Sequence, residues 1–327
     1  MTILVTGGAG YIGSHTVRLL RERGRDVVVL DTLEFGHRAA VGDAPLVQGD
    51  IADQEVVANV VSKYGVDAVV HFAAFKAPGE SMEQPGRYFA NNVSSSATFF
   101  ETLSRTGVDR LVFSSSCAVY GTPDRVPVGE DAPIHPESPY GESKAMTERV
   151  LFWYERCRGL RSVSLRYFNA AGAWADGSIG EDWTLTLNLV PLVMKATLGR
   201  REPLQVFGTD YPTPDGTAIR DYVHVVDLAE AHLKALEFLE AGGATTALNL
   251  GTGVGTSVLE VLAAAERASG RPVPYELAPR RAGDPTALFS QNGRSQAVLD
   301  WEAQHRLDAI MSSAWAWHST HPDGFGD

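Results

Sequence analysis

Short apolar runs alternate with amphipathic segments through the first half of this chain, and this alternation limits its possible folds more than any other feature. Ile3–Val5 is followed by a glycine-rich turn and then, over Tyr11–Arg23, by apolar residues at helical spacing. Val27–Leu30 is a continuous apolar run, which is typical of a strand buried on both faces. Similar short runs occur at residues 46–47, 68–72, 111–113 and 162–167. Strands that alternate with helices in this way predict an α/β fold built on a doubly wound parallel sheet.

The pattern changes after about Phe168. The segments 173–182 and 208–216 are rich in Gly, Pro and Asp, and clean strand–helix pairs become fewer. We therefore expect a sheet domain over residues 1–170 and a smaller α/β domain over residues 171–327, with segments near 217–250 returning to the first domain. A second domain of this kind commonly closes over the carboxyl ends of the strands, where doubly wound sheets bind ligands.

Composition excludes several classes of function. The chain has 28 Lys and Arg against 40 Asp and Glu, and the resulting net charge of −12 argues against a protein that binds nucleic acid. Two cysteines, Cys117 and Cys157, cannot cross-link a fold of this size, and no Cys/His pattern at zinc spacing predicts a metal site. No apolar run reaches the roughly 20 residues that cross a membrane, and the first residues lead into a strand rather than a signal peptide. We expect a cytoplasmic protein that binds neither membrane nor metal.

Gly7, Gly10 and Gly13 lie between the first predicted strand and the first predicted helix. Their G-x-x-G-x-x-G spacing is a variant of the dinucleotide-binding fingerprint of Rossmann folds, in which glycines allow a tight turn, a close approach of backbone N–H groups to a pyrophosphate, and close helix–strand packing. Asp31 ends the second strand, where an acid binds the adenosine ribose hydroxyls. Its carboxylate repels a 2′-phosphate and no Arg follows before Arg38, so the sequence favours NAD over NADP.

Asp50 and Ile51 follow the third predicted strand. At this edge of the sheet they would flank the adenine of the cofactor. Asp50 is equally suited to cap the next helix. The sequence leaves both interpretations open.

Tyr140 and Lys144 form a second chemical signal. If a helix begins near Tyr140, Lys144 lies one turn later on the same face. An ammonium beside a phenol favours the phenolate, and the positive nicotinamide of bound NAD would add to this effect. Together they would turn a group with a pKa of about 10 into a general base at neutral pH. Ser116 ends a predicted strand at the same edge of the sheet and is placed to hydrogen-bond the same substrate hydroxyl. Behind a dinucleotide motif, these three residues predict a catalytic site.

These residues and several longer stretches resemble the extended short-chain dehydrogenase/reductase superfamily and, within it, the UDP-glucose 4-epimerases. The matching stretches are residues 7–15, 71–76, 113–116, 119–121, 165–169, 220–224 and 279–284, and the likeness continues to His321–Gly324. The resemblance implies an isomerase that is a homodimer, keeps NAD bound, and interconverts UDP-glucose and UDP-galactose through a 4-keto sugar. It also implies that Tyr140 is the base, that Lys144 holds the nicotinamide ribose, and that Ser116 relays the proton.

The same resemblance assigns further residues to the two ligands. For the cofactor it implies Tyr11, Ile12, Phe72, Ala73, Ala74, Lys76, Asn91, Ser114 and Tyr167. For the UDP-hexose substrate it implies Phe168, Asn169, Asn188, Leu189, Phe207, Arg220, Arg281, Asp284 and Leu288, besides Ser116 and Tyr140. Lys76 would contact the cofactor phosphates, and Arg220 and Arg281 would bind the UDP phosphates, because a guanidinium suits a bidentate oxyanion.

The chain departs from the family at several positions. Leu187 stands where the family has an Asn before Asn188, and Val-Ser-Ser follows Asn91-Asn92 where the family more often has Val-Asn-Gly. Leu288 stands where some relatives have Tyr and others Cys. Its intermediate volume predicts UDP-glucose and UDP-galactose as the main substrates, with some activity on the UDP-N-acetylhexosamines. A core leucine without substrate contact is the alternative interpretation of this position.

Two other functions stay open. A nucleotide-sugar dehydratase or decarboxylase on the same scaffold would need an acid pair beside the active-site hydroxyl, and this chain has Cys117-Ala118 there. A non-catalytic NAD-binding sensor would be expected to have lost Tyr140 or Lys144. For the homodimer, the resemblance points to the helices around Tyr88–Arg105 and Lys144–Cys157.

Overall fold

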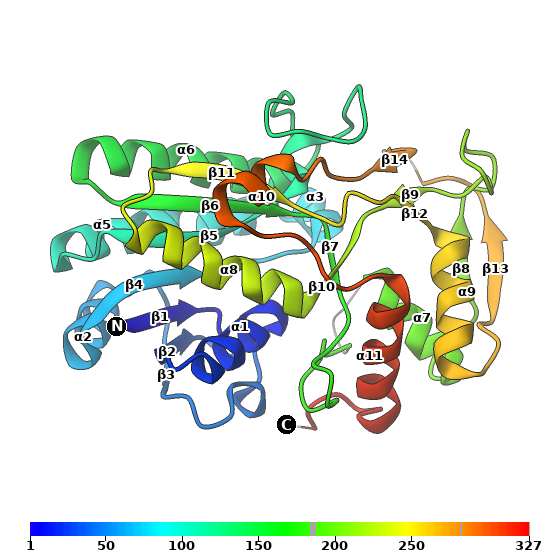
Figure 1. Ribbon diagram of the computed structural model, residues 1–327, viewed down its shortest axis with the longest axis horizontal. Helices are drawn as coiled ribbons and strands as arrows, with labels where there is room; N and C mark the ends of the chain where they lie inside the picture. The colour runs from blue at the N-terminus through cyan, green and yellow to red at the C-terminus, as the bar shows by residue number, and fades with distance from the viewer. Residues whose placement is uncertain (184–187, 282, 327) are drawn as a thin grey trace.

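The larger lobe is built on a parallel sheet (Figure 1). The computed structural model describes residues 1–183, 188–281 and 283–326. Within these ranges the sheet consists of seven strands: β1 (Thr2–Thr6), β2 (Asp26–Asp31), β3 (Leu46–Gln48), β4 (Val66–His71), β5 (Arg110–Ser116), β6 (Arg161–Tyr167) and β11 (Thr246–Leu250). Their spatial order is β11-β6-β5-β4-β1-β2-β3, and all neighbours run parallel. The predicted doubly wound sheet is confirmed.

Helices cover both faces of this sheet. One face carries α1 (Tyr11–Glu22) and α8 (Val225–Glu240), and the other carries α2 (Gln54–Tyr64), α5 (Ser96–Thr106) and α6 (Pro139–Arg158). Successive residues of β1 point to opposite faces: Ile3 and Val5 belong to the core beneath α1 and α8, whereas Leu4 belongs to the core beneath α2 and α5. A strand buried on both faces has no polar side, which explains the uninterrupted apolar runs in the sequence.

The helix α6, which carries Tyr140 and Lys144, has clear boundaries in the sequence. Pro139 lies in its first turn, and the Ser138 side chain accepts a hydrogen bond from Gly141 N at 3.1 Å. Gly159 ends the helix in the left-handed conformation, with φ at 77°. The helix therefore starts one residue before the predicted position.

The N-cap of the helix α2 tests one of the two interpretations of Asp50, which is that Asp50 caps this helix. Its N-cap is Asp53, whose side chain accepts a hydrogen bond from Glu55 N at 3.0 Å. Asp50 accepts from Ala52 N at 2.8 Å, within the turn before the helix. The prediction that Asp50 caps this helix is wrong, because the free N–H groups of the first turn lie within reach of Asp53 instead.

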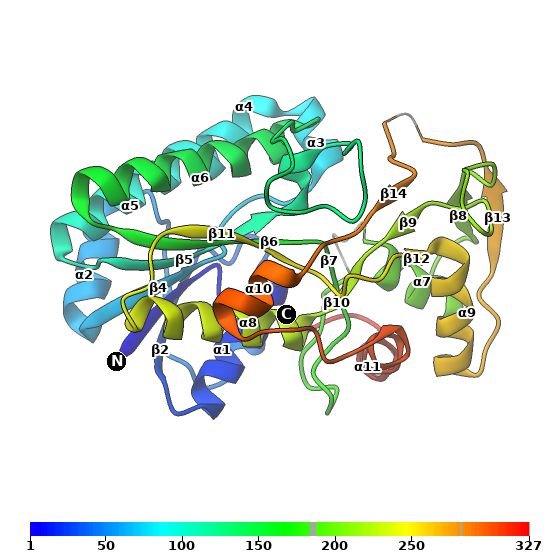
Figure 2. The same ribbon diagram turned by 45° about the horizontal axis from the view of Figure 1, so that its top comes forward.

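The smaller lobe lies at the carboxyl ends of the sheet strands (Figures 1 and 2). Its helices are α7 (Leu189–Thr197), α9 (Val258–Ser269) and α11 (Leu307–Thr320), which share one apolar core. The short strands form small sheets: β8 (Leu204–Phe207) with β13 (Tyr275–Ala278), β7 (Asn169–Ala171) with β10 (Tyr222–His224), and β9 (Ile219–Arg220) between β12 (Thr256–Ser257) and β14 (Ala287–Leu288). The remaining elements are η1 (Arg38–Val41), α3 (Pro78–Glu83), α4 (Pro85–Tyr88), the π-helix η2 (Phe89–Ser95), η3 (Cys117–Tyr120) and α10 (Gly293–Leu299).

Segments from the second half of the chain are built into the larger lobe. β11 pairs with β6 from Thr246 opposite Val163 to Leu250 opposite Tyr167. The helix α8 packs against α1. None of the helices in the described ranges is both long and apolar enough to cross a membrane. The division at residue 170 stays a prediction.

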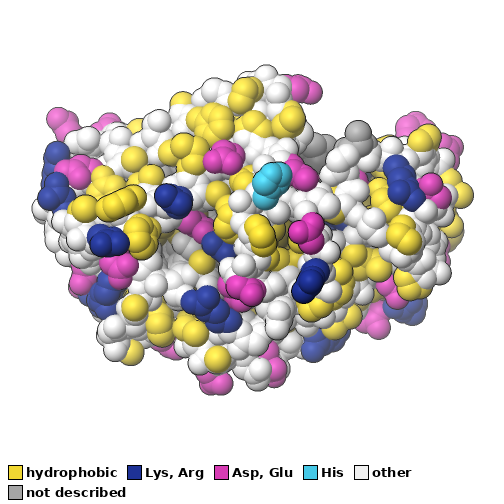
Figure 3. All heavy atoms as spheres, turned by 90° about the horizontal axis from the view of Figure 1, so that it is seen from above, with side chains coloured by type: hydrophobic (Ala, Val, Ile, Leu, Met, Phe, Trp, Pro, Cys, Tyr) yellow, Lys and Arg dark blue, Asp and Glu magenta, His cyan; other side chains and the backbone are white. Residues whose placement is uncertain are grey.

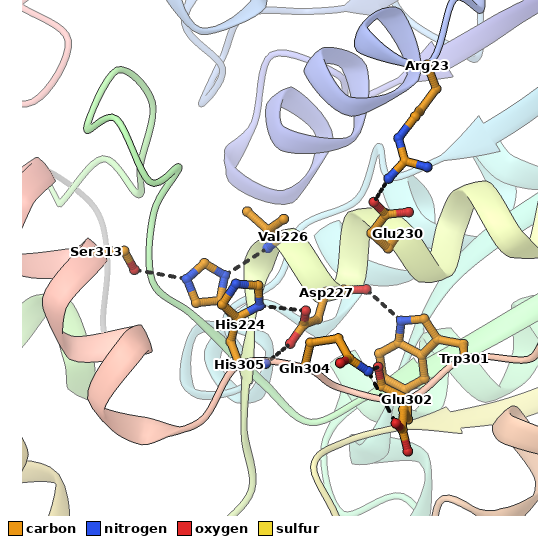
Figure 4. Close-up of polar contacts among 10 residues, drawn as sticks. All are labelled: Arg23, His224, Val226, Asp227, Glu230, Trp301, Glu302, Gln304, His305 and Ser313. Atoms are coloured by element: carbon orange, nitrogen blue, oxygen red, sulfur yellow. Dashed lines mark hydrogen bonds and ion pairs between the residues drawn. The ribbon is translucent and has the colours of Figure 1, made fainter.

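A buried polar cluster fixes the start of α8 against the end of the chain (Figure 4). The Asp227 carboxylate accepts hydrogen bonds from His305 N at 2.9 Å and from His305 Nδ1 at 2.7 Å, and Trp301 Nε1 donates to the Asp227 carbonyl at 2.9 Å. His224 Nδ1 accepts from a backbone N–H, so its Nε2 donates to the Ser313 hydroxyl on α11 at 3.0 Å. These contacts join the two lobes.

Candidate active site

The glycine-rich turn lies at the carboxyl end of β1, between the loops that follow β2 and β4. Gly7 has a φ of 69°, and a Cβ at this position would come within 2.6 Å of Ala73 N. A Cβ at Gly13 would lie 2.3 Å from the Gly7 carbonyl oxygen. Gly10 is the N-cap of α1, and a Cβ there would meet the Gly7 oxygen at 3.4 Å. The turn therefore presents bare backbone at a helix N-terminus, which fits the pyrophosphate of a dinucleotide.

Asp31 holds this turn against β2. It is 8% exposed, and its carboxylate accepts hydrogen bonds from Ala9 N and Leu33 N, both at 2.9 Å. Burial raises the pKa of Asp31, and the two backbone N–H groups oppose that shift. The carboxylate thus lies where the adenosine ribose of a dinucleotide would be expected.

The loop after β4 is pinned to α6 by a residue that the sequence reasoning did not select. Asn92 accepts a hydrogen bond from Phe75 N at 2.9 Å and donates to the Phe75 carbonyl at 3.1 Å and to Ser143 Oγ at 3.0 Å. Asn91, the predicted cofactor residue, donates to Asn92 Oδ1 at 3.0 Å. Both asparagines belong to the π-helix η2, and such irregular turns often occur at functional sites.

Glu181 connects residues predicted for the cofactor with residues predicted for the sugar. Its Oε1 lies 3.4 Å from Lys76 Nζ and accepts a hydrogen bond from Asn188 Nδ2 at 2.7 Å. Tyr11, in the first turn of α1, donates to the Gly172 carbonyl at 2.6 Å. The other predicted cofactor residues lie at the same edge of the sheet: Ile12 in α1, Asp50 and Ile51 after β3, and Phe72, Ala73 and Ala74 after β4.

The structure brings the three predicted catalytic residues together. Tyr140 is hydrogen-bonded to the side chain of Ser116, the last residue of β5. Lys144 is 4% exposed, and its Nζ donates to the Ser114 carbonyl at 2.8 Å. The same Nζ lies 4.9 Å from the centre of the Phe113 ring and 5.9 Å from the centre of the Tyr140 ring. One helix and one strand end thus supply the whole group.

Burial dominates the protonation of this group. It raises the pKa of Tyr140 to about 12, and the hydrogen bond with Ser116 only partly offsets that shift. Burial also lowers the pKa of Lys144 to about 7, against the opposing charge of Glu148. The expectation that the Lys144 ammonium and the positive nicotinamide of bound NAD together make Tyr140 a base at neutral pH stays a prediction. Ionisation of Tyr140 needs a further positive charge.

Tyr167 and the residues after it line the same strand ends. The Tyr167 hydroxyl is hydrogen-bonded to Ser114 Oγ. Asn169 donates to the Asp221 carbonyl through its backbone N at 2.9 Å and its Nδ2 at 3.0 Å. The Asp221 carboxylate in turn accepts hydrogen bonds from Thr252 and from Ser290. The Asn169 side chain, predicted to meet the sugar, is thus held by the backbone carbonyl of a buried aspartate that the sequence reasoning did not select.

The two predicted phosphate-binding arginines are both held by neighbouring side chains. Arg220 forms an ion pair with Asp284, which was predicted to contact the uridine ribose. The Arg281 guanidinium lies 4.0 Å from the centre of the Phe207 ring, at the end of β8. The four residues predicted to bind the nucleotide therefore lie in two neighbouring pairs, although the members of each pair are far apart in the sequence.

Leu288 lies between the predicted sugar site and a small apolar core. It pairs with Arg220 along β14 and β9, is 9% exposed, and belongs to a cluster with Phe168 against which Cys117 packs. Burial raises the pKa of the Cys117 thiol to about 12, so this cysteine stays protonated and acts as a packing residue. Leu189 begins α7 after Asn188, whereas Leu187 lies outside the described residues.

Comparisons with known proteins agree with this arrangement. Residues 3–251 match the model of the NAD dependent epimerase/dehydratase family. A UDP-glucose 4-epimerase of Lacticaseibacillus casei is 48% identical over 329 residues, which cover 100% of this chain and 99% of the relative. The chain belongs to the UDP-glucose 4-epimerase family. The match extends through the smaller lobe and is therefore not limited to the nucleotide-binding half of the chain.

Solved UDP-glucose 4-epimerases share this fold. The enzyme from Brucella ovis, in complex with NAD, is 45% identical, matches with a TM-score of 0.94, and covers 96% of this chain and 97% of its own. The enzyme from Bifidobacterium longum, in complex with NAD+ and UDP, is 37% identical with a TM-score of 0.93 and covers 99% of this chain and 100% of its own. The resemblance inferred from the sequence is confirmed.

Proposed function

We propose that this chain interconverts UDP-glucose and UDP-galactose by inverting the configuration at C4 of the sugar, with NAD kept in the site throughout. The observation that carries this proposal is the buried group of Tyr140, Ser116 and Lys144 at the sheet edge that also bears the glycine turn. A hydroxyl that can lose a proton beside a dinucleotide site is what reversible oxidation of an alcohol needs. Membership of the UDP-glucose 4-epimerase family supports the same conclusion.

The proposed roles follow from the positions of the side chains. NAD accepts a hydride from the sugar C4 and returns it to the opposite face of the 4-keto sugar. Tyr140 takes the proton of the 4-hydroxyl and later gives it back, Ser116 hydrogen-bonds the same hydroxyl, and Lys144 orients the nicotinamide ribose. Bare backbone at Gly7 and Gly13 would hold the pyrophosphate, and Asp31 the adenosine ribose.

The substrate would bind in the smaller lobe. Arg220 and Arg281 would bind the UDP phosphates, Phe207 would stack beside the uracil, and Asp284 would meet the uridine ribose. Asn169, fixed on Asp221, would contact the diphosphate sugar. The remaining proposed substrate contacts are Phe168, Asn188, Leu189 and Leu288.

The decisive experiment is incubation of the purified protein with UDP-galactose and no added cofactor. We expect an equilibrium mixture of UDP-glucose and UDP-galactose, because the proposal requires NAD to stay bound through purification. Loss of water or carbon dioxide from the sugar would instead identify a dehydratase or decarboxylase. Binding of NAD without any turnover would identify a sensor and overturn the proposal.

Leu288 offers a test of the substrate range. Replacing Leu288 with Tyr adds volume at the wall that faces the C2 substituent, so activity on the UDP-N-acetylhexosamines should fall more than activity on UDP-glucose and UDP-galactose. A steric change of this kind is typically worth about 1–3 kcal/mol. The ratio of kcat/KM for the two substrate pairs measures the effect. An equal response of both pairs would make Leu288 a core residue without substrate contact.

We also propose that the protein is a cytoplasmic homodimer that takes part in galactose metabolism. Met146, Phe152 and Trp153 of α6 are large apolar residues with 40%, 43% and 55% of their surface exposed. Figure 3 looks down on the side of the molecule where α6 lies and shows hydrophobic side chains there among charged ones. A second copy packed on this helix would cover them.

A further inference from the structure

A buried ion pair lies one helical turn beyond Lys144. Arg166 on β6 donates to Glu148 of α6 through Nε at 2.9 Å and through its terminal nitrogen at 2.5 Å, one bond to each carboxylate oxygen. The two side chains are 9% and 12% exposed. Arg166 lies in the matching stretch 165–169, but no role follows for either residue from the sequence or from the proposed function.

The pair is the centre of a larger network. Ser115 Oγ donates to Glu148 at 2.5 Å, and Arg166 donates to the Tyr120 hydroxyl at 2.9 Å. That hydroxyl donates to Asn249 Oδ1 on β11 at 2.7 Å. The network therefore ties α6 to β5, β6, η3 and β11 just behind the catalytic group.

Ser115 is the link to the chemistry. It lies between Ser114, whose carbonyl accepts the Lys144 ammonium, and Ser116, whose side chain is hydrogen-bonded to Tyr140. A carboxylate on α6 that holds Ser115 thus fixes the strand end at the residue between the two catalytic contacts. Movement of α6 along β5 would change both contacts together.

Stability alone does not explain a charge pair at this place. Burying two charges costs desolvation, and an apolar pair of similar volume is often as stable or more so. Glu148 also follows Lys144 by four residues on the same helix face, so its charge acts on the Lys144 ammonium. The other groups near Lys144 are neutral or weakly polar: the Ser114 carbonyl and Phe113 ring of β5, the Tyr140 phenol of α6, whose pKa burial raises to about 12, and His71 of β4, which burial keeps uncharged.

We propose that Glu148 is a positioning residue for the epimerase reaction. Held by Arg166 and Ser115, it fixes the first half of α6 against the end of β5 and favours the charged form of Lys144. This inference rests on the proposed function for its kinetic consequence, but not for the protonation of Lys144.

The test is Glu148→Gln, which keeps the size of the side chain and removes its charge. The Nζ signal of Lys144 is followed by NMR against pH in the holoenzyme with 15N-labelled lysine and assigned by its loss in Lys144→Met. We expect the pKa of Lys144 to fall by about one unit and the alkaline limb of kcat to move to lower pH by a similar amount, because an opposite charge is lost. Identical titrations in the variant and the parent would overturn the proposal.

Matched variants separate positioning from folding. Glu155→Gln makes the same change two turns further along α6, where the side chain meets Thr245 N at 3.3 Å, and should leave both titrations unchanged. If Glu148→Gln does not fold because Arg166 is left unpaired, the double variant Glu148→Gln/Arg166→Met removes both charges and should show a smaller fall in the Lys144 pKa, because a nearby positive charge is lost as well. A parent protein that does not convert UDP-galactose would refute the proposed function, whereas the NMR titration still decides the role of Glu148.

Discussion

At the scale of single residues, the surroundings of Tyr140 strongly influence its protonation. Burial opposes its ionisation, and within the described residues Ser116 provides the hydrogen bond that lowers its pKa. With its pKa raised to about 12, the Tyr140 phenol is protonated at neutral pH, and a positive charge bound nearby would favour its ionisation. We therefore expect the proposed proton transfer to require the bound cofactor.

Tyr140→Phe removes only this hydroxyl. We expect NAD to stay bound and turnover to fall by on the order of 10²–10⁴, the usual effect of losing a general acid–base group. The measurement is the rate of UDP-galactose conversion together with the NAD content of the purified protein. Near-parental turnover would show that another group moves the proton.

The arginine pair at positions 280 and 281 allows a matched comparison. Arg281 lies over Phe207, whereas Arg280 lies over Tyr211 and pairs with Asp210 at 2.6 Å. Arg281→Ala should weaken UDP binding by roughly 1.5–3 kcal/mol, since it removes a charge-assisted contact, and Arg280→Ala should change it little. Isothermal titration with UDP measures both. Equal losses in the two variants would contradict the assignment to Arg281.

Some residues of the site could be predicted from the sequence and others could not. Gly7, Gly13 and Asp31 could be predicted, because backbone geometry and ribose recognition require particular residue types at a fixed spacing. Asn92 and Glu148 are ordinary polar residues in helical segments, and the sequence gives no sign that they are buried. Their importance arises only when distant strands and helices meet.

At the scale of elements, one face of α6 lines the candidate active site and the opposite face lies at the surface of the molecule. Its inner face carries Tyr140, Lys144 and Glu148, whereas Met146 and Trp153 point outward. A helix with apolar residues on an outward face gives a weak helical pattern, which is why the sequence alone does not separate its two faces. The Gly- and Pro-rich segments of the smaller lobe were harder still, because short strands such as β7 and β9 exist only through their partners.

Trp153→Glu tests the outward face. Trp153 is 55% exposed, and a charge there should destabilise a dimer that buries it, giving monomers in sedimentation velocity at micromolar concentration. Val254→Glu is the control, because Val254 is equally exposed at 55% but lies outside α6. Unchanged sedimentation of the Trp153 variant would place the interface elsewhere.

At the scale of the whole molecule, five buried histidines are expected to contribute to the loss of stability in acid. Burial lowers the pKa of His71, His224 and His318 to about 3, and that of His15 and His232 to about 4. In the unfolded chain these groups take up protons below pH of about 6.5, whereas the folded protein resists doing so. Stability is therefore complete above that pH and is lost as the pH falls toward the folded values.

We expect the melting temperature to fall steeply between about pH 6.5 and pH 5, since each such histidine costs up to about 1.4 kcal/mol per pH unit. His232→Phe, which keeps a ring against Phe72, should make the fall less steep. Thermal unfolding of both proteins across this pH range measures the difference. Parallel curves would show that His232 does not contribute to the acid sensitivity.

The pairing of β11 with β6 also means that this edge of the sheet is completed late during synthesis of the chain. The ribosome completes β6 long before it reaches residues 246–250, so the growing chain carries an open parallel edge while the residues in between are made. A cell that produces this protein must keep that edge from pairing with a neighbouring nascent chain. A chain that ended at residue 170 would leave this edge of β6 without its partner strand.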